Sequence, residues 1–221
     1  LAHTENMLKQ HLGTSVKKLL FIPYAGVSIS FDQYEKMVSR SLAGFGYQVE
    51  SIHHSQSPTT LINQAESILV GGGNTFNLLK CLYQNNLLET IRQRIKSGLP
   101  YVGWSAGSNI AAPTICTTND MPIVEPPSFK SLNLVPFQLN PHYIEENPVG
   151  HNGETREQRI NEYLTANNNQ RVLGIPEGTA LQLKNNQLNY LGDKTGVIFS
   201  SFEQEERKQL IEPGADLSRL L

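Results

Sequence analysis

Short apolar blocks alternate along the chain with longer segments whose apolar residues recur at helical spacing. The blocks predicted to be strands meeting loops are 17–26, 47–53, 68–75 and 100–104. Segment 30–46 is predicted to be a helix that ends at Gly44 and Gly46, because its apolar residues Phe31, Tyr34, Met37, Val38 and Leu42 fall at helical spacing. Segments 59–67 and 74–98 are also predicted to be helical, and the second holds one or two helices.

This alternation is typical of a mostly parallel sheet covered by helices on both faces. The later part differs: 156–167 is predicted to be a helix and 171–178 a strand. Segment 179–200 alternates and turns at Asn185-Asn186 and Gly192-Asp193, as antiparallel strands do. We expect a loose helix in the charged last twenty residues. Because there is no repeat or linker, we predict one domain over 1–221.

The composition argues against several classes of protein. The chain has 221 residues, 38% of them hydrophobic and 17% charged, and a net charge of −2. This balance is ordinary for a soluble globular protein and argues against a nucleic-acid binder. No apolar run reaches the roughly 18 residues of a membrane span, and because the start is polar we expect no secretory leader. Cys81 and Cys116 have no CxxC partner, which disfavours a disulfide scaffold or zinc ribbon and favours a cytoplasmic location.

The apolar run 100–104 leads directly into Gly103-Trp104-Ser105-Ala106-Gly107, which fits the pattern G-x-S-x-G. In a nucleophile elbow the serine lies on a sharp strand-to-helix turn, and glycines are needed because neighbouring side chains would collide. The turn leaves the backbone N–H of the next residue, Ala106, free to bind an oxyanion. Because the pattern is common, Ser105 is either a nucleophile or a hydroxyl in a loop that needed two glycines.

A second glycine-rich turn, Gly71-Gly72-Gly73-Asn74, ends another predicted strand. Ligands of open α/β sheets bind at such strand ends. The turn is a candidate phosphate cradle, a source of oxyanion donors, or a tight turn with Asn74 or Thr75 as helix cap. The phosphate role is disfavoured because neither G-x-G-x-x-G nor a P-loop lysine is present. We favour Gly73 as an oxyanion donor.

A serine nucleophile needs a base, and the chain has six histidines. His3 and His11 lie in the polar N-terminal segment, His53 and His54 follow a predicted strand, and His151 lies in a polar loop where we expect it to be solvated. A strand over 132–140, ended by Pro141, would place His142 at a strand end, which is the favoured position for a catalytic residue. His142 is therefore the candidate base, although single histidines are more often structural.

The base needs a carboxylate that holds its tautomer and stabilises the imidazolium. Glu177 directly follows an apolar strand, between Pro176 and Gly178, and Asp120 is the competitor. An acid at a strand end is often only a cap, so the residues by themselves leave this choice open.

Taken together, these residues resemble peptidase E, the aspartyl dipeptidase family. The matching stretches are FIPYAGV (21–27), GGGNTF (71–76), GWSAG (103–107), TTNDMPIV (117–124), NPH (140–142), GETREQRI (153–160) and PEG (176–178). They appear in the family's order, spread over most of the chain, and are specific in combination. The resemblance implies a Ser105, His142 and Glu177 triad and an oxyanion hole from the backbone of Gly73 and Ala106.

The resemblance also implies a fold and a reaction. The fold is a three-layer α/β/α sandwich similar to class I glutamine amidotransferases, with a mostly parallel, flavodoxin-like sheet and a serine in place of their cysteine. The order Ser, His, Glu along the chain differs from that of α/β-hydrolases. The implied reaction is hydrolysis of dipeptides with an N-terminal aspartate, without metal or cofactor, by a monomer or homodimer.

Substrate-binding residues follow from the same resemblance. Arg156 matches the family position expected to bind the aspartyl carboxylate, for which a bidentate guanidinium is well suited. A cation in the first turn of a helix opposes the helix dipole, which favours a functional explanation. Arg159 either shares this role or faces water. Asp120 and Glu154 are the candidates for the substrate amine, and Asn74 is a further expected substrate contact.

Other hypotheses remain beside this one. A cyanophycinase-like peptidase acting on β-aspartyl linkages has the same sandwich and a serine nucleophile, but the match at GETREQR favours the dipeptidase. A non-catalytic ligand-binding protein would not need all of Ser105, His142 and Glu177. A cysteine hydrolase using Cys116 would lack the elbow glycines, and we expect Cys116 to be buried. The family also begins with an apolar strand that nothing before Leu1 supplies, so we expect this sequence to be incomplete.

Overall fold

The computed structural model describes residues 4–145, 150 and 152–221. The helices are α1 (Glu5–Leu12), α2 (Phe31–Ala43), α3 (Pro58–Gln64), α4 (Thr75–Gln84), α5 (Leu88–Lys96), α6 (Ala106–Asn109) and α7 (Arg156–Ala166), with 3-10 turns η2 (Ile52–His54) and η3 (Ser218–Leu220). The strands are β1 (Lys18–Ile22), β2 (Gln48–Ser51), β3 (Ile68–Val70), β4 (Tyr101–Gly103), β5 (Gln138–Pro141), β6 (Arg171–Ile175), β7 (Ala180–Lys184), β8 (Gln187–Leu191), β9 (Gly196–Ser200) and β10 (Lys208–Ile211).

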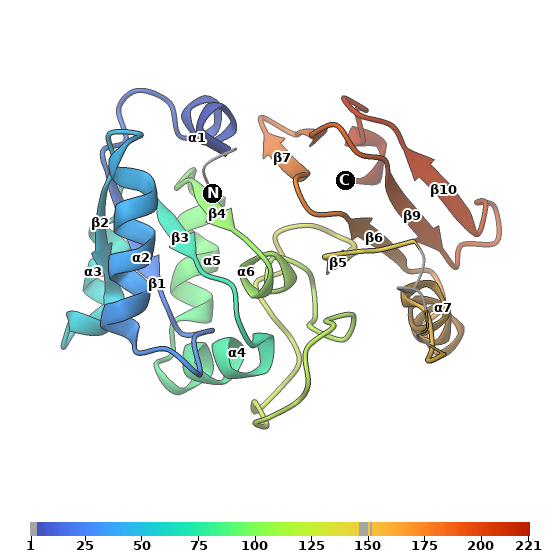
Figure 1. Cartoon of the computed structure of the whole chain (residues 1–221), viewed down its shortest axis with the longest axis horizontal. Coiled ribbons are helices and arrows are strands. Elements are labelled where there is room, and N and C mark those ends of the chain that lie inside the picture. Colours follow the sequence, from blue (N-terminus) through green and yellow to red (C-terminus); the bar gives the residue numbers. More distant parts are fainter. Residues whose placement is uncertain (1–3, 146–149, 151) are drawn as a thin grey trace.

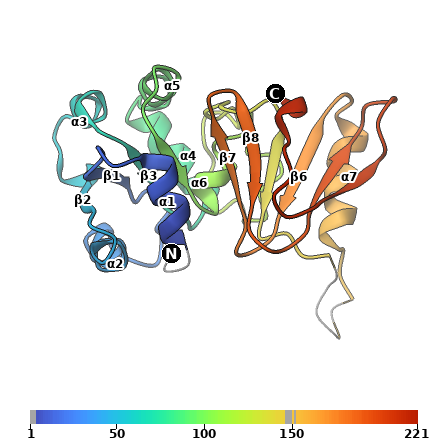
Figure 2. The ribbon, with the colours of Figure 1, turned by 90° about the horizontal axis from the view of Figure 1, so that it is seen from above.

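The first half of the chain forms a parallel sheet in the order β2-β1-β3-β4. Alternate residues of β1 point to opposite faces: Leu20 and Ile22 pack in one core with α3, α4 and α5, and Leu19 and Phe21 pack in another with α1 and α2. Helices therefore cover both faces, as the alternation of apolar blocks predicted (Figures 1 and 2). All four carboxyl ends lie at one edge of this sheet.

The second half forms a mixed sheet in the order β10-β9-β6-β5, in which β5 and β6 are parallel and the other pairs antiparallel. Helix α7 packs on one face, through Ile160 and Leu164 against Val172 and Phe199. The separate hairpin β7-β8 and η3 contribute to the core on the other face, where Tyr190 is fully buried. The two halves lie side by side, with α6 between them (Figure 2).

Capping residues in the sequence fix where helices α2 and α7 begin. Ser30 and Gln33 form a reciprocal capping box at the start of α2, and Thr155 and Gln158 form another at the start of α7. Each box satisfies backbone N–H groups that the first helical turn leaves without partners. The start of α7 is therefore fixed within the motif that contains Arg156.

The predicted elements are confirmed in type and order through β6, and segment 74–98 holds two helices. The predicted Asn185-Asn186 turn is confirmed, since both residues have positive φ, 52° and 60°, as a type I′ hairpin turn requires. Two expectations need correction. The charged C-terminal segment, expected to end in a loose helix, forms strand β10, in which Ile211 is buried beside β9, and ends in a short 3-10 turn. The strand expected over 132–140 is limited to β5.

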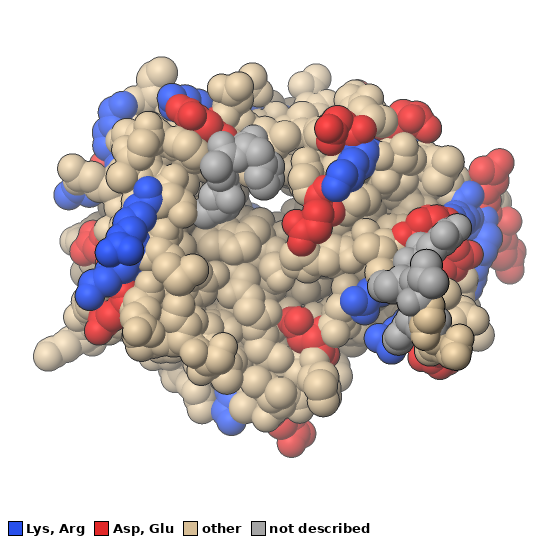
Figure 3. Space-filling model, viewed as in Figure 1, with Lys and Arg blue, Asp and Glu red and all other residues tan. Residues whose placement is uncertain are grey.

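No helix in the described part of the chain is long and apolar enough to cross a membrane. On the face seen in Figure 3, lysine and arginine side chains are dispersed among acidic and uncharged ones. This face therefore offers no continuous basic surface of the kind that binds a nucleic-acid backbone.

A close contact in the second sheet gives a stability prediction. A Cβ built on Gly174 of β6 would lie 2.6 Å from Val197 Cγ1 and 2.7 Å from Tyr143 Cγ, so Gly174→Ala overpacks the core. We expect it to lower the free energy of unfolding by about 1–3 kcal/mol. Gly44→Ala is the control, because Gly44 is helical, with φ −62°, and has nothing within 4 Å of the added atom. Urea denaturation of both variants tests this, and equal midpoints would contradict it.

Candidate active site

Ser105 lies on a sharp turn between β4 and α6, at φ 53° and ψ −113°. These angles are unusual for a residue with a side chain and cost about 1–3 kcal/mol. Both glycines of the motif are sterically required: a Cβ on Gly103 would lie 2.5 Å from Gly107 O, and one on Gly107 would lie 2.4 Å from Val70 O. This is the geometry of a nucleophile elbow, in which the sharp turn exposes the serine side chain at the end of the strand.

The glycine-rich turn after β3 packs directly against this elbow. A Cβ on Gly72 would lie 2.9 Å from Ser105 Cβ, and Gly73 has φ 131° with Ala25 O only 2.3 Å from where its Cβ would be. Among the described residues, neither the Gly73 N–H nor the Ala106 N–H has a hydrogen-bond partner. Two unpartnered N–H groups beside a serine on an elbow can serve as oxyanion donors.

His142 and Glu177 come together at the ends of two neighbouring parallel strands. Pro141 of β5 pairs in register with Ile175 of β6, so the residues that follow these strands lie side by side. His142 Nδ1 is hydrogen-bonded to Glu177 Oε1. The His142 backbone has φ 58°, a left-handed conformation that turns its side chain away from the strand direction. The carboxylate that meets His142 is therefore Glu177 and not Asp120.

Asn119 connects this histidine to Arg156. Its Nδ2 donates to Pro141 O at 2.9 Å, directly before His142, and its Oδ1 accepts from Arg156 Nη1 at 2.8 Å and from Asn140 Nδ2 at 2.9 Å. The pKa of the Arg156 guanidinium is lowered by burial and by the nearby Arg159, while Asp120 raises it. Arg156 is thus partly withdrawn from water, close to Asp120.

Asp120 lies at the start of α4. Its Oδ2 accepts from the Thr75 N–H at 2.7 Å and from Thr75 Oγ1 at 2.5 Å, and its Oδ1 has no hydrogen-bond partner among the described residues. An anion at this position is favoured by the helix dipole. One carboxylate oxygen of Asp120 therefore remains available.

Asn74 also has a structural role. Its side chain caps α4 by accepting from the Asn77 N–H, and it donates to Met121 O.

A cavity of about 410 Å³ opens at the glycine-rich turn. Its lining comes from the segment after β1, from α2, from the turn itself and from the irregular segment that holds Asp120, and it includes Tyr34, Gly72, Gly73 and Asn74. A volume of this size suits a small ligand. Gly73, the expected oxyanion donor, and Asp120 therefore line the same cavity.

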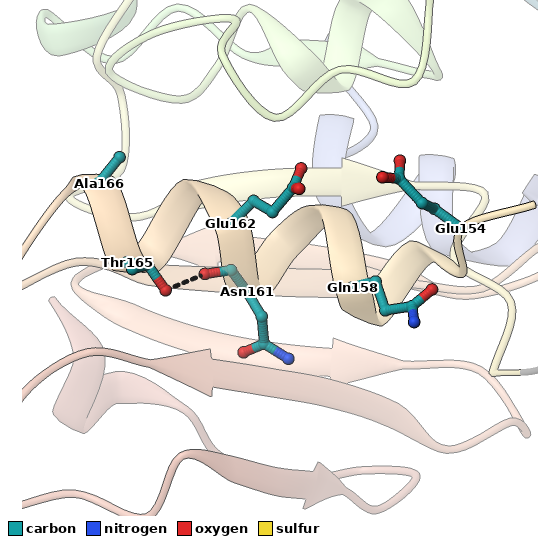
Figure 4. Close-up of a pocket in the computed structure, with 6 residues that line it drawn as sticks. All are labelled: Glu154, Gln158, Asn161, Glu162, Thr165 and Ala166. Atoms are coloured by element: carbon teal, nitrogen blue, oxygen red, sulfur yellow. Dashed lines mark hydrogen bonds between the residues drawn. The ribbon is translucent and has the colours of Figure 1, made fainter.

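A larger hollow of about 650 Å³ runs along α7. Figure 4 shows that its lining residues, from Glu154 to Ala166, lie along this one helix and the turn before it. Glu154 Oε2 is 3.5 Å from Arg159 Nε, and both side chains are more than half exposed. Glu154 and Arg159 thus form a surface ion pair, which favours Asp120 over Glu154 as a partner for a substrate amine.

The remaining candidates fall outside this constellation. Cys116 is exposed, which corrects the expectation of a buried cysteine, and lies on an irregular segment without elbow glycines. His3 and His151 lie outside the described residues. His11 is hydrogen-bonded to Tyr101 O, and burial lowers its pKa. Of the described histidines, His142 is the one held by Glu177.

Not all of the expected contacts form. In the described part of the chain, no hydrogen bond joins Ser105 Oγ to His142. Such catalytic hydrogen bonds are often long until a substrate is held between the groups. Asn119 was missed as a separate candidate in the sequence. Its only signal there was its place in the TTND segment between two motifs.

The family follows from comparison with known proteins. The model of peptidase family S51 matches residues 1–191. The chain belongs to peptidase family S51. Membership of the family confirms the prediction of a serine-type dipeptidase on an α/β fold. The chain is 50% identical to peptidase E of Shewanella denitrificans over all of this chain and 92% of that protein. It is 47% identical to peptidase E of Nostoc sp., over 93% of this chain and 85% of that protein.

Solved structures agree with this fold. A Listeria monocytogenes protein assigned as a peptidase E superposes with a TM-score of 0.70 at 26% identity, covering 86% of this chain and 94% of that one. A peptidase from an acI-B1 actinobacterium superposes with a TM-score of 0.71 at 18% identity, covering 98% and 90% respectively, and shows the same fold.

The hydrogen bonds of Asn119 give a testable prediction for this S51 peptidase. We expect Asn119→Ala to lower kcat/KM by about 10- to 100-fold, because the segment before His142 and the Arg156 guanidinium lose a common support. Steady-state kinetics on an accepted dipeptide test this. Asn167→Ala is the control, since Asn167 Nδ2 donates only within the exposed end of α7, to Tyr163 O. Unchanged kinetics in folded Asn119→Ala would contradict the prediction.

Proposed function

We propose that the chain is an aspartyl dipeptidase, which cleaves the peptide bond after an N-terminal aspartate through an ester on Ser105. The observation that carries the proposal is the elbow itself: a serine at positive φ beside the unpartnered N–H groups of Gly73 and Ala106. A strained serine facing two free donors is costly to maintain and is typical of acyl transfer.

In the proposed reaction His142 takes the proton of Ser105 while Oγ attacks the carbonyl carbon of the aspartyl residue. The negative charge that develops on the carbonyl oxygen is held by the N–H groups of Gly73 and Ala106. The tetrahedral intermediate then collapses, and His142 delivers the proton to the leaving amine. Water attacks the ester by the reverse sequence, with His142 as base, and releases aspartate. Glu177 holds Nδ1–H and stabilises the imidazolium.

The proposed specificity depends on two charged side chains near this centre. Arg156 would bind the β-carboxylate of the substrate, because a partly buried guanidinium offers a planar pair of donors that an ammonium does not. The free Oδ1 of Asp120 would accept from the α-amino group. Asn74 lines the same cavity and is a further proposed contact. Opposite charges placed in this way select a short acidic residue with a free amine.

The first test measures release of free aspartate from Asp-Leu, alongside Glu-Leu, Ala-Leu and N-acetyl-Asp-Leu. We expect hydrolysis of Asp-Leu only, reduced by about three orders of magnitude or more in Ser105→Ala because the nucleophile is lost. Ser108→Ala is the matched control. Ser108 lies in α6, the helix that Ser105 precedes, and its Oγ donates only to Gly103 O, at 3.0 Å.

Each outcome of this panel is informative. Cleavage of N-acetyl-Asp-Leu would contradict the requirement for a free amine and with it the role of Asp120. Turnover of a β-aspartyl substrate with none of Asp-Leu would replace the proposal by the cyanophycinase-like alternative. Binding of Asp-Leu without turnover would favour a non-catalytic binding protein.

A second prediction concerns the side-chain carboxylate of the substrate. We expect Arg156→Lys to lower kcat/KM for Asp-Leu by about 10- to 100-fold, because a bidentate charge-assisted contact becomes a point charge. Arg159→Lys is the matched control and should change little, because its ion pair with Glu154 is exposed. Equal effects of the two substitutions would argue against Arg156 as the specificity residue.

A further inference from the structure

Four metal-ligating side chains converge at a place that the proposed reaction does not use. Asp32 and Glu35 lie on the first turns of α2, and His53 and His54 lie in η2 after β2. Each offers one ligand atom, and these atoms all lie within 4.8 Å of one another. His53 Nε2 is 2.9 Å from Asp32 Oδ1, and His54 Nε2 is 2.7 Å from Glu35 Oε2 and 3.8 Å from Asp32 Oδ1.

These separations suit a small four-coordinate cation. In a tetrahedral zinc site with bonds of about 2.0–2.1 Å, neighbouring ligand atoms lie about 3.3 Å apart. The three separations given above fall on both sides of this value. Binding of one ion by all four atoms would lengthen the shorter separations and shorten those above about 3.3 Å.

Buried hydrogen bonds already orient two of the four ligands. Ser51 is fully buried, its Oγ is 2.6 Å from His53 Nδ1, and its N–H donates to Glu35 Oε1 at 3.0 Å. When His53 Nδ1–H donates to Ser51 Oγ, the lone pair of Nε2 is directed to the cluster. Outer hydrogen bonds of this kind fix the tautomer and orientation of metal ligands. One buried residue thus supports a histidine and a carboxylate together.

Charge also favours a cation. The rings of His53 and His54 lie 3.9 Å apart between centroids, so two imidazole ligands stand beside each other. The ligand oxygens of Asp32 and Glu35 lie within 4.8 Å of each other, and a cation between two carboxylates reduces their repulsion. A divalent ion satisfies both carboxylates and uses both imidazoles in their neutral form.

We propose that Asp32, Glu35, His53 and His54 form a binding site for a divalent transition-metal cation of the zinc class. Two imidazoles with two carboxylates suit zinc, cobalt or nickel, whereas calcium and magnesium prefer oxygen ligands only. The ion links α2 to the segment after β2. Helix α2 also supplies Tyr34, whose hydroxyl donates to Gly72 O at 2.9 Å, so the ion braces a helix that contacts the glycine-rich turn.

The test titrates ZnCl₂ by calorimetry into untagged protein that has been stripped with EDTA and desalted. We expect one ion per chain and a loss of affinity of at least about 10-fold in Glu35→Gln and in His54→Asn. Ser51→Ala, which removes the Oγ contact with His53 Nδ1 but keeps the N–H that donates to Glu35, should lose about 10-fold. Glu50→Gln is the matched control on the neighbouring exposed position, and His11→Asn controls for histidines elsewhere.

Thermal unfolding by circular dichroism provides an independent readout that also checks folding in EDTA. Zinc should raise the midpoint of the wild type and of both controls, but not that of Glu35→Gln or His54→Asn, because a ligand bound to the native state stabilises it. Equal zinc affinity in all variants would place the ion elsewhere and overturn the proposal. No binding to the wild type would also overturn it and leave only the hydrogen bonds of His53 with Asp32 and of His54 with Glu35.

Discussion

The backbone from Gly103 to Gly107 is so tightly packed that a side chain at Gly107 would collide with Val70 O at the end of β3, and one at Gly103 would collide with Gly107 O. This contact forces Ser105 into its positive-φ conformation and places the Ala106 N–H at the start of α6. The glycine-rich turn closes over the same point, with Gly72 against Ser105. The proposed nucleophile and both proposed oxyanion donors are therefore consequences of one steric arrangement, which requires β3 and β4 to be parallel neighbours.

The other half of the proposed centre is built by different forces. The register of β5 and β6 sets His142 beside Glu177, and hydrogen bonds from Asn119 connect this pair to Arg156. The two halves come from separate sheets, so the distance from Ser105 to His142 depends on how the sheets pack. A substrate held between the halves would contact both. Its binding energy would then help to align Ser105 with His142.

The proposed cation site has a third origin. It lies at the end of β2 in the first sheet, and two of its four ligands, His53 and Glu35, are hydrogen-bonded to Ser51. The proposed cation site follows β2 and the serine elbow follows β4, so both lie at the carboxyl ends of strands in the same parallel sheet. Strand ends present backbone and side-chain polar groups together, and each crossover adds residues from a following helix. Because α2 contacts both the cluster and Gly72, the two regions share a structural element although they share no ligand.

The sequence by itself determined most strands and helices of the first half and the glycine pattern around Ser105. These follow from periodicity and from steric limits on glycine turns, which act over a few residues. His142 was a candidate because a predicted strand ends before it, and Arg156 was a candidate through the resemblance to peptidase E. The residues by themselves left Glu177 and Asp120 open, the resemblance implied Glu177, and the tertiary structure shows Glu177 paired with His142, 35 residues away in the chain. It also revealed the connecting position of Asn119. Such pairings depend on strand order and register, and composition and local spacing contain no information about either.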